Sequence, residues 1–245
     1  MGKYFLKLAL MQPTFNPWVG YFDLIDYVDT FVFLDTVQLN QQSWQTRNKL
    51  KIQNKEFLFS LPIQKNKSKH ELLIKDALLD FRKFDFRKKL FRTLEQNYRK
   101  SKYFTEVNLF IKSIVLFESN SLSTYNINMI TQITKKLKIE TSICILSEEA
   151  YINNSSKGNL VLDICQHFKT QEYVSPLGAE AYLNEVKNDF HKENIDIIYQ
   201  VYEHPIYQQL GEEFMPYIGI FDLLYNHGFE ESLNIIRKGR KYENR

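Results

Sequence analysis

The chain has 245 residues, of which 44% are hydrophobic and 25% charged, so it can bury a core and remain soluble. Its formal net charge of +3 is too small to indicate a nucleic-acid-binding protein by itself. The sequence has no signal-peptide pattern and no apolar run near the ~20 residues that span a bilayer. Its two cysteines form no C-x-x-C pair, and we therefore expect a cytoplasmic protein with reduced thiols.

The N-terminal part alternates strands and helices. Residues 5–12 predict a strand, residues 21–28 an amphipathic helix, and residues 30–35 a continuously apolar strand, which is the pattern of a strand buried on both faces. A strand, a helix and a strand in this order predict a parallel pair with a right-handed crossover.

The remaining pattern predicts a single α/β domain over residues 1–245 with a mainly parallel central sheet. After a polar tract at 38–51, strands are predicted at 56–63, 72–79, 141–146, 172–175 and 195–201. Helices are predicted at 84–100, 108–118, 122–138, 159–168, 179–186, 216–225 and 230–236. The stretch at about 81–138 is a helical insert in this scheme, and the basic tail at 237–245 is expected to be mobile.

Several motifs of known chemistry are absent from the sequence. It has no G-x-x-x-x-G-K-S/T run, no G-x-G-x-x-G, no G-x-S-x-G and no H-E-x-x-H. Cys165 and His167 are two residues apart on a predicted helix, so they point to different faces and make a poor zinc pair. No motif therefore specifies a cofactor, and the cofactor stays unknown at this level.

The first polar loop follows the first strand and precedes the first helix, where α/β proteins place ligands. It offers Gln12, Asn16 and Tyr21 as contacts, although an ordinary βα unit without a ligand has the same outline. The loop partly resembles nucleotidyltransferases of the phosphopantetheine adenylyltransferase type. Residues of their pattern G-x-F-x-P-x-x-x-G-H-x-x-L-I have counterparts in Phe15, Pro17, Gly20, Leu24 and Ile25, with one residue fewer between the proline and the glycine. Tyr21 replaces the histidine, and tyrosine cannot carry the positive charge that stabilises a transferring phosphate. The resemblance implies a Rossmann-like N-terminal half.

A second polar tract follows the buried strand at 30–35. Asp35 ends the strand, and Gln38, Trp44, Arg47 and Asn48 come next. A tryptophan face can stack on a sugar or a base, an arginine fork can hold a phosphate, and amides can bond hydroxyl groups. The alternative is a solvated loop with one anchoring tryptophan. The complete set directly after a buried strand favours a site, with Asp35 as the acid or base.

These two tracts together resemble the WbqC-like family. Residues 11–25, 31–38 and 43–49 follow the family patterns Q-P-x-Y-x-P-W-x-G-Y-F-D-L-I, F-V-x-L-D-x-V-Q-F and S-W-Q-x-R-N. Residues 207–209, 214–216 and 221–228 are similar to its Y-x-Q, F-x-P and L-D-L-L-F-N-x-G. Phe15 stands where tyrosine is usual, and Leu39 where phenylalanine is usual. The resemblance covers nearly the whole chain.

Members of this family are associated with O-antigen and other surface-polysaccharide gene clusters. The resemblance implies a transferase that adds an acyl or aminoacyl group to a nucleotide-linked amino sugar. The expected partner is that small molecule, and no membrane partner is expected. Two alternatives stay open. One is a divergent nucleotidyltransferase, and the other is a non-catalytic protein that binds a sugar nucleotide.

Further candidates lie after the later strands. Lys157 lies just before the predicted helix at 159–168 and could hold a phosphate, as Arg47 could, although a simple helix cap is the alternative. Gly178 follows the next strand and would allow close backbone approach. His204 is the second choice for the acid or base, although a lone histidine is more often structural. Tyr207 and Gln208 match the family pattern and complete the predicted substrate contacts.

The helix at 84–100 carries many lysines and arginines. Leu90, Leu94 and Tyr98 line one of its faces, so its charge is expected on the solvent side. We therefore do not expect a nucleic-acid partner, and a tRNA acceptor end is the nucleic acid that such a helix would suit best.

Overall fold

The computed structural model describes residues 6–40, 42–65, 72–150 and 155–245. Its centre is a six-stranded sheet in the order β5-β2-β1-β6-β7-β8. Five neighbouring strands are parallel: β1 (Lys7–Met11), β2 (Thr30–Phe33), β5 (Ser142–Ile145), β6 (Glu172–Pro176) and β7 (Asp196–Gln200). The last strand, β8 (Tyr242–Asn244), is antiparallel to β7. The predicted α/β class and mainly parallel sheet are confirmed.

The strand order reverses beside β1. The chain first builds outward from β1 through β2 to β5, and then returns to the other side of β1 with β6 and β7. In open α/β sheets, ligands bind outside the carboxyl ends of the strands where the order reverses. The topology therefore directs attention to the loops that follow β1 and β6.

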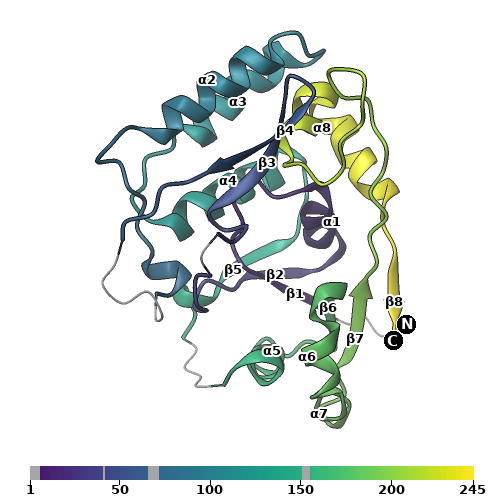
Figure 1. The fold of residues 1–245 in the computed structure, drawn as a ribbon. Helices are drawn as coiled ribbons and strands as arrows, with labels where there is room; N and C mark the ends of the chain where they lie inside the picture. Colours follow the sequence, from purple (N-terminus) through teal and green to yellow (C-terminus); the bar gives the residue numbers. More distant parts are fainter. Residues whose placement is uncertain (1–5, 41, 66–71, 151–154) are drawn as a thin grey trace.

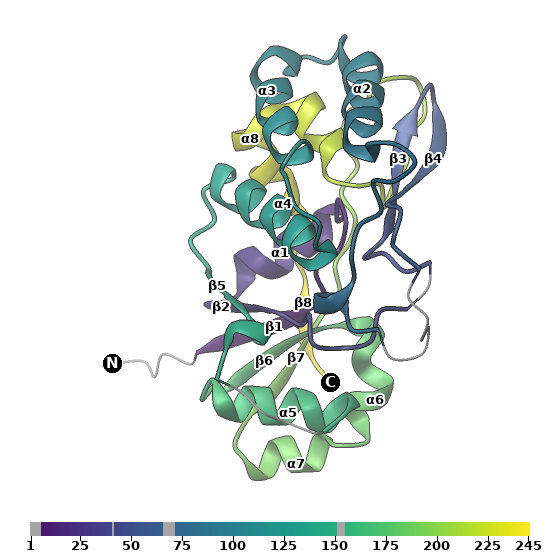
Figure 2. The same ribbon diagram turned by 90° about the vertical axis from the view of Figure 1, so that its left-hand side faces the viewer.

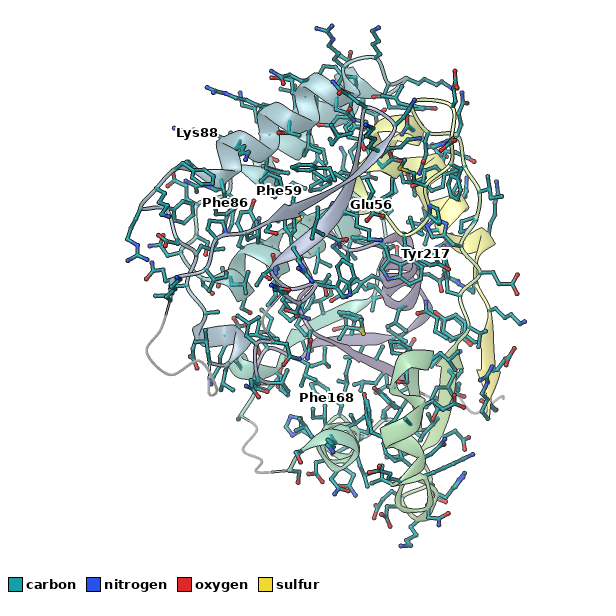
Figure 3. The ribbon with its side chains drawn as sticks, in the orientation of Figure 1. Glu56, Phe59, Phe86, Lys88, Phe168 and Tyr217 are labelled. Carbon is teal, nitrogen blue, oxygen red and sulfur yellow. The ribbon has the colours of Figure 1, made fainter. Side chains whose placement is uncertain are left out.

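Helices cover both faces of the sheet. One face carries α1 (Val19–Tyr27), α4 (Leu122–Lys136) and α8 (Phe221–Lys238), and the other carries α5 (Lys157–His167), α6 (Glu180–Asn184) and α7 (Lys187–Lys192) (Figures 1 and 2). Each face has its own hydrophobic core, with Phe59 and Phe86 in one and Phe168 packed against the other (Figure 3). Among the helices of the described ranges, none combines the length and apolar character needed to cross a membrane.

The segment between β2 and α4 adds a hairpin and a helical layer to this core. The hairpin pairs β3 (Arg47–Ile52) with β4 (Lys55–Ser60), and the turn residues Gln53 and Asn54 have positive φ angles of 48° and 61°. Two central residues with positive φ form a type I′ turn, whose backbone twist matches the right-handed twist of the two strands. Beside the hairpin lies α2 (Phe86–Tyr98), and α3 (Phe104–Val115) packs against α2 (Figure 2). The sequence pattern did not predict β3.

Two local predictions are wrong. The strand predicted at 72–79 is instead a short 3-10 helix, η1 (Ile74–Asp76), flanked by isolated bridges such as Gln38 to Leu73. The tail predicted to be mobile forms β8 at the edge of the sheet. Arg240, just before β8, binds the carboxylates of Asp23 and Asp26 on α1, and this long-range pairing orders the tail. The break predicted near residue 228 is confirmed, because Gly228 has a φ of 70° and kinks α8.

Candidate functional site

A cavity of about 310 Å³ opens at the carboxyl end of β1, beside the point where the strand order reverses. Its walls come from four parts of the chain: the end of β1, the following loop with α1, the start of β3 with the loop before it, and the segment before α8. The lining residues are Met11, Thr14, Trp18, Tyr21, Trp44, Asn48, Lys49 and Tyr217. Four of these eight side chains are aromatic, so the cavity offers broad faces for a flat or ring-shaped ligand.

The position of Trp18 depends on the glycine that follows it. A Cβ atom on Gly20 would lie 2.3 to 2.7 Å from the Trp18 ring, so only glycine lets the indole lie against the first turn of α1. The indole also packs against Tyr217, with 5.3 Å between ring centroids, and edge-on against Tyr202 at 5.4 Å. Trp18 thus packs against these two rings and forms one wall of the cavity.

The loop between β1 and α1 is clamped by Asn48 on β3. The Asn48 Nδ2 donates to the carbonyl oxygens of Phe15 at 2.9 Å and Asn16 at 2.8 Å. On the other side, the Gly219 N–H donates to the Lys49 carbonyl at 3.0 Å, and a Gly219 Cβ would collide with the Asn16 amide. Three segments distant in sequence are therefore locked together around the cavity.

Tyr21 presents a polar atom near the cavity floor. Its hydroxyl donates to the Gln12 carbonyl oxygen at 2.9 Å, and burial raises the pKa of this phenol well above its usual range. The hydroxyl therefore stays protonated at neutral pH and cannot replace a histidine as a cation. The Gln12 side chain is itself occupied, because its Oε1 accepts a hydrogen bond from Gln45.

Charge at the cavity comes from its rim. The Lys49 ammonium forms an ion pair with Glu56 of β4 at 2.9 Å. Figure 3 labels Glu56 and also Tyr217, which lies in the segment before α8. Trp44 is half exposed and forms the outer wall. No aspartate or glutamate is among the lining residues that the structure describes, so the cavity itself supplies aromatic faces, amides and a lysine.

His204 lies behind Trp18. Its ring stacks on the indole with a centroid separation of 6.0 Å and on Tyr207 at 6.2 Å. Nδ1 lies 2.9 Å from the Pro205 carbonyl oxygen, which assigns the ring hydrogen to Nδ1 and leaves Nε2 as an acceptor. Nε2 is buried without a hydrogen-bond partner among the described residues, and burial lowers the pKa of this imidazole. The histidine is therefore neutral at pH 7.

Asp35 lies away from the aromatic cavity. It lines a separate space of about 720 Å³ at the ends of β2 and β5, where its carboxylate is 2% exposed. It accepts hydrogen bonds from the Ser123 hydroxyl at 3.2 Å and from the Ser147 hydroxyl and N–H at 2.6 and 3.1 Å. These bonds tie the end of β2 to α4 and to the segment after β5, which is a structural role.

The predicted contacts are only partly brought together. Tyr21, Trp44 and Asn48 line the cavity, whereas Gln12, Asn16 and His204 lie directly behind it. The others do not line it: Gln38, Arg47, Lys157, Gly178, Tyr207 and Gln208. Gly178 has no atom within 4 Å of where a Cβ would be, so close approach is not used there.

Five lining residues were not among the predicted contacts: Met11, Thr14, Trp18, Lys49 and Tyr217. Trp18 carried a usable signal, because a glycine follows it at the start of a helix. Tyr217 carried none, because the fold alone brings it from a distant segment. Within the described ranges, no group of three or more His, Cys, Asp or Glu is placed to hold a metal ion.

Comparison with known proteins agrees with the motifs. The model of the WbqC-like protein family matches residues 12–233. The chain belongs to the WbqC-like protein family. It is 31% identical over 226 residues to the uncharacterized protein Rv1507c of Mycobacterium tuberculosis (strain ATCC 25618 / H37Rv). The aligned region covers 91% of this chain and 95% of that relative. No solved structure matches.

In this WbqC-like protein, several of the polar residues in the family motifs hold the fold together. Asn48 clamps the loop after β1, Asp35 joins three segments, and Asp23 receives Arg240 at 2.7 Å. The motif residues Trp18, Tyr21 and Trp44 line the cavity, together with Asn48. These three aromatic residues of the motifs therefore face the cavity.

Proposed function

We propose that this protein is a transferase of bacterial surface-polysaccharide biosynthesis that adds an acyl or aminoacyl group to a nucleotide-linked amino sugar. The observation that carries the proposal is the aromatic cavity at the carboxyl end of β1, beside the reversal of strand order. Aromatic faces bind sugar rings and bases, and this position in the sheet is where α/β proteins bind nucleotides. The association of the family with polysaccharide gene clusters supplies the substrate class.

The cavity volume limits which part of the substrate it holds. About 310 Å³ is at the lower end of the range for small-molecule sites, which suits one ring rather than a whole sugar nucleotide. We assign the cavity to the base or the sugar, between Trp18 and Trp44. Arg47, which opens β3 directly before the lining residues Asn48 and Lys49, is the group assigned to the diphosphate.

Amide formation requires a base, because an amino group must lose a proton when it attacks the acyl carbon. The N–C bond forms as the bond from that carbon to a thiol or hydroxyl leaving group breaks, and the proton passes to the leaving group. His204 is the assigned base because it is neutral and its Nε2 is a free acceptor directly behind Trp18. Its access to substrate requires Trp18 to shift when the ligand binds.

A second candidate, a protein that binds a sugar nucleotide without catalysis, is favoured by one observation. Asp35, the carboxylate best placed by sequence, is occupied by Ser123 and Ser147, and no carboxylate lines the cavity among the described residues. The two candidates differ in the outcome of a transfer assay.

The test combines binding and turnover. Titration calorimetry should detect binding of at least one member of a panel of UDP-, dTDP- and CMP-linked amino sugars. Mass spectrometry should then detect an amide product with acyl-CoA or aminoacyl-tRNA as donor. His204→Phe retains the ring stacking and removes the base, so product formation should fall about 100-fold or more with binding little changed. Binding without product from any donor would favour the second candidate, and no binding would contradict both.

A further inference from the structure

A further cleft lies at the other end of β3 from the aromatic cavity. Its volume is about 570 Å³, and it is formed by the end of β3 with the hairpin turn, the last turns of α2, and the loop at 210–211. The two sites share no lining residue: Asn48 and Lys49 of β3 line the first, and Lys51 and Ile52 line the second. The cleft is therefore a separate space, and the proposed function leaves it unused.

The floor of the cleft holds two buried ionisable side chains. Lys51 is 2% exposed and Asp222 is 1% exposed. The Lys51 ammonium donates to Gln209 Oε1 at 3.2 Å and to the Glu213 carbonyl oxygen. The Tyr98 hydroxyl donates to Asp222 Oδ1 at 2.9 Å. Burial of charged groups is costly, so their retention beside an open cleft points to a role beyond packing.

One carboxylate oxygen of this floor is incompletely hydrogen-bonded. Asp222 Oδ2 and the hydroxyl of the neighbouring Tyr207 are both buried, and neither forms a hydrogen bond of full geometry among the described residues, although Tyr207 interacts with the carboxylate. Buried polar atoms are hydrogen-bonded in the large majority of cases, and a carboxylate oxygen can accept more than one hydrogen bond, so Oδ2 keeps capacity for a donor in addition to Tyr207. Burial raises the pKa of Asp222 to about 6, against the opposing effects of Tyr98, Tyr207, Lys51 and Asn226. The carboxylate is thus an ionised acceptor at pH 7.5.

The walls of the cleft are polar and its rim is basic. Amide and hydroxyl side chains line the walls: Gln53, Asn54, Thr93, Gln96 and Asn97. Such groups both donate to and accept from the hydroxyls of a sugar. Arg99 and Lys100, directly after α2, stand at the rim, and neither forms an ion pair within the described part of the chain. A guanidinium beside an ammonium is suited to a phosphate.

One side of the cleft is fixed by Gly211. Its φ is +91°, and a Cβ there would lie 1.5 Å from Asn54 Oδ1. The loop therefore lies directly against the hairpin turn, which only glycine permits. This contact gives the cleft a preformed wall.

We propose that this cleft is a second ligand site and that it binds a sugar phosphate, with a hydroxyl or amino group of the sugar donating to Asp222 Oδ2 and the phosphate held by Arg99 and Lys100. The amides of the walls bind the remaining hydroxyl groups. This site is independent of the aromatic cavity and of the reaction assigned to it.

Titration calorimetry at pH 7.5 with glucose 1-phosphate and glucosamine 6-phosphate tests the assignment. The wild-type protein should bind at least one of them more tightly than it binds inorganic phosphate or glucose. The double variant R99A/K100A should weaken binding about tenfold or more, because it removes both phosphate contacts. The matched control is K88A/R92A, which removes two exposed cations of α2 that do not line the cleft; Lys88 is labelled in Figure 3.

Asp222 and the aromatic cavity provide two further readouts. Asp222→Asn should weaken binding of the sugar phosphates without changing the weak binding of inorganic phosphate. Trp44→Ala should leave sugar-phosphate binding unchanged, which separates this site from the proposed sugar-nucleotide site. The proposal is overturned if neither sugar phosphate binds, if inorganic phosphate binds equally well, or if R99A/K100A behaves like K88A/R92A.

Discussion

Arg240 anchors the C-terminal tail, and its removal should destabilise the protein strongly. Its guanidinium binds Asp23 Oδ1 at 2.7 Å and also contacts Asp26. Both carboxylates are buried, with 0% and 5% of their side chains exposed, and Arg240 itself is 28% exposed. Arg240→Ala would therefore leave two buried carboxylates without their shared cation.

The remaining partners of the two carboxylates set the expected magnitude. Removing one partner of a buried ion pair costs ~3–5 kcal/mol. Asp23 would keep the Tyr242 hydroxyl at 2.8 Å and Gln200 Nε2 at 3.0 Å, and Asp26 would keep Arg237 at 2.7 Å. These bonds retain part of the stabilisation, so we expect the free energy of unfolding to fall by about 3 kcal/mol, the lower end of that range.

Urea denaturation at pH 7, followed by tryptophan fluorescence, measures this change. The control is Arg245→Ala, because Arg245 also lies in the tail but forms exposed pairs with Glu180 at 3.6 Å and Glu243 at 3.2 Å. Exposed pairs contribute ~0–1 kcal/mol, so the control should be nearly neutral. Equal, small losses for both variants would refute the anchoring of the tail through Asp23 and Asp26.

Two further predictions concern the loop clamp and the buried carboxylate. Gly219→Ala places a Cβ 1.9 Å from Asn16 Nδ2, so urea denaturation should show a loss of roughly 1–3 kcal/mol. Gly178→Ala, with no atom within 4 Å of the new Cβ, should be nearly neutral, and equal losses would contradict the clamp. Because the pKa of Asp222 is about 6 in the folded protein and 3.8 ordinarily, the folded state binds more protons between these values. The contribution of Asp222 to the free energy of unfolding should therefore fall as pH rises from 4 to 7. Asp222→Asn lacks this titration. Its free energy of unfolding should therefore rise by on the order of 3 kcal/mol relative to that of the wild type over the same pH range. A constant difference between the two would contradict the buried, ionised state.

The central sheet could be predicted from the sequence because its signals are local. The apolar runs that became β1 and β2 are read directly from consecutive residues, and the helix between them has apolar residues at helical spacing. Buried parallel strands are the elements with the strongest such pattern. Their order in the sheet followed only from the structure, because pairing of β1 with β6 joins residues far apart in the chain.

The elements that were missed depend on distant partners. Strand β3 is rich in polar and basic residues, and Lys51 is buried there only because Gln209 and the Glu213 carbonyl meet its ammonium. The tail is ordered by Arg240 and two aspartates more than 200 residues earlier. Neither partnership leaves a mark in the local sequence.

The candidate site was also predicted only in part, because local sequence does not show the distant partners of its residues. Tyr21, Trp44 and Asn48 come from the two motif tracts and converge on one cavity, as expected for loops at one edge of a sheet. Asp35 had the right position in its strand, but Ser123 and Ser147 occupy its oxygens. Local sequence shows which residues stand at the end of a strand, and only the fold shows whether they are free to meet a ligand.

Binding of nucleotide-linked amino sugars to the aromatic cavity tests the central claim most directly. Titration calorimetry should compare wild type with Trp44→Ala and with Phe84→Ala, because both side chains are about half exposed, at 51% and 49%, and only Trp44 lines the cavity. Loss of a stacking face should weaken binding by about tenfold or more in Trp44→Ala, whereas Phe84→Ala should match wild type. Failure of every panel member to bind, or equal affinity of the two variants, would contradict the account.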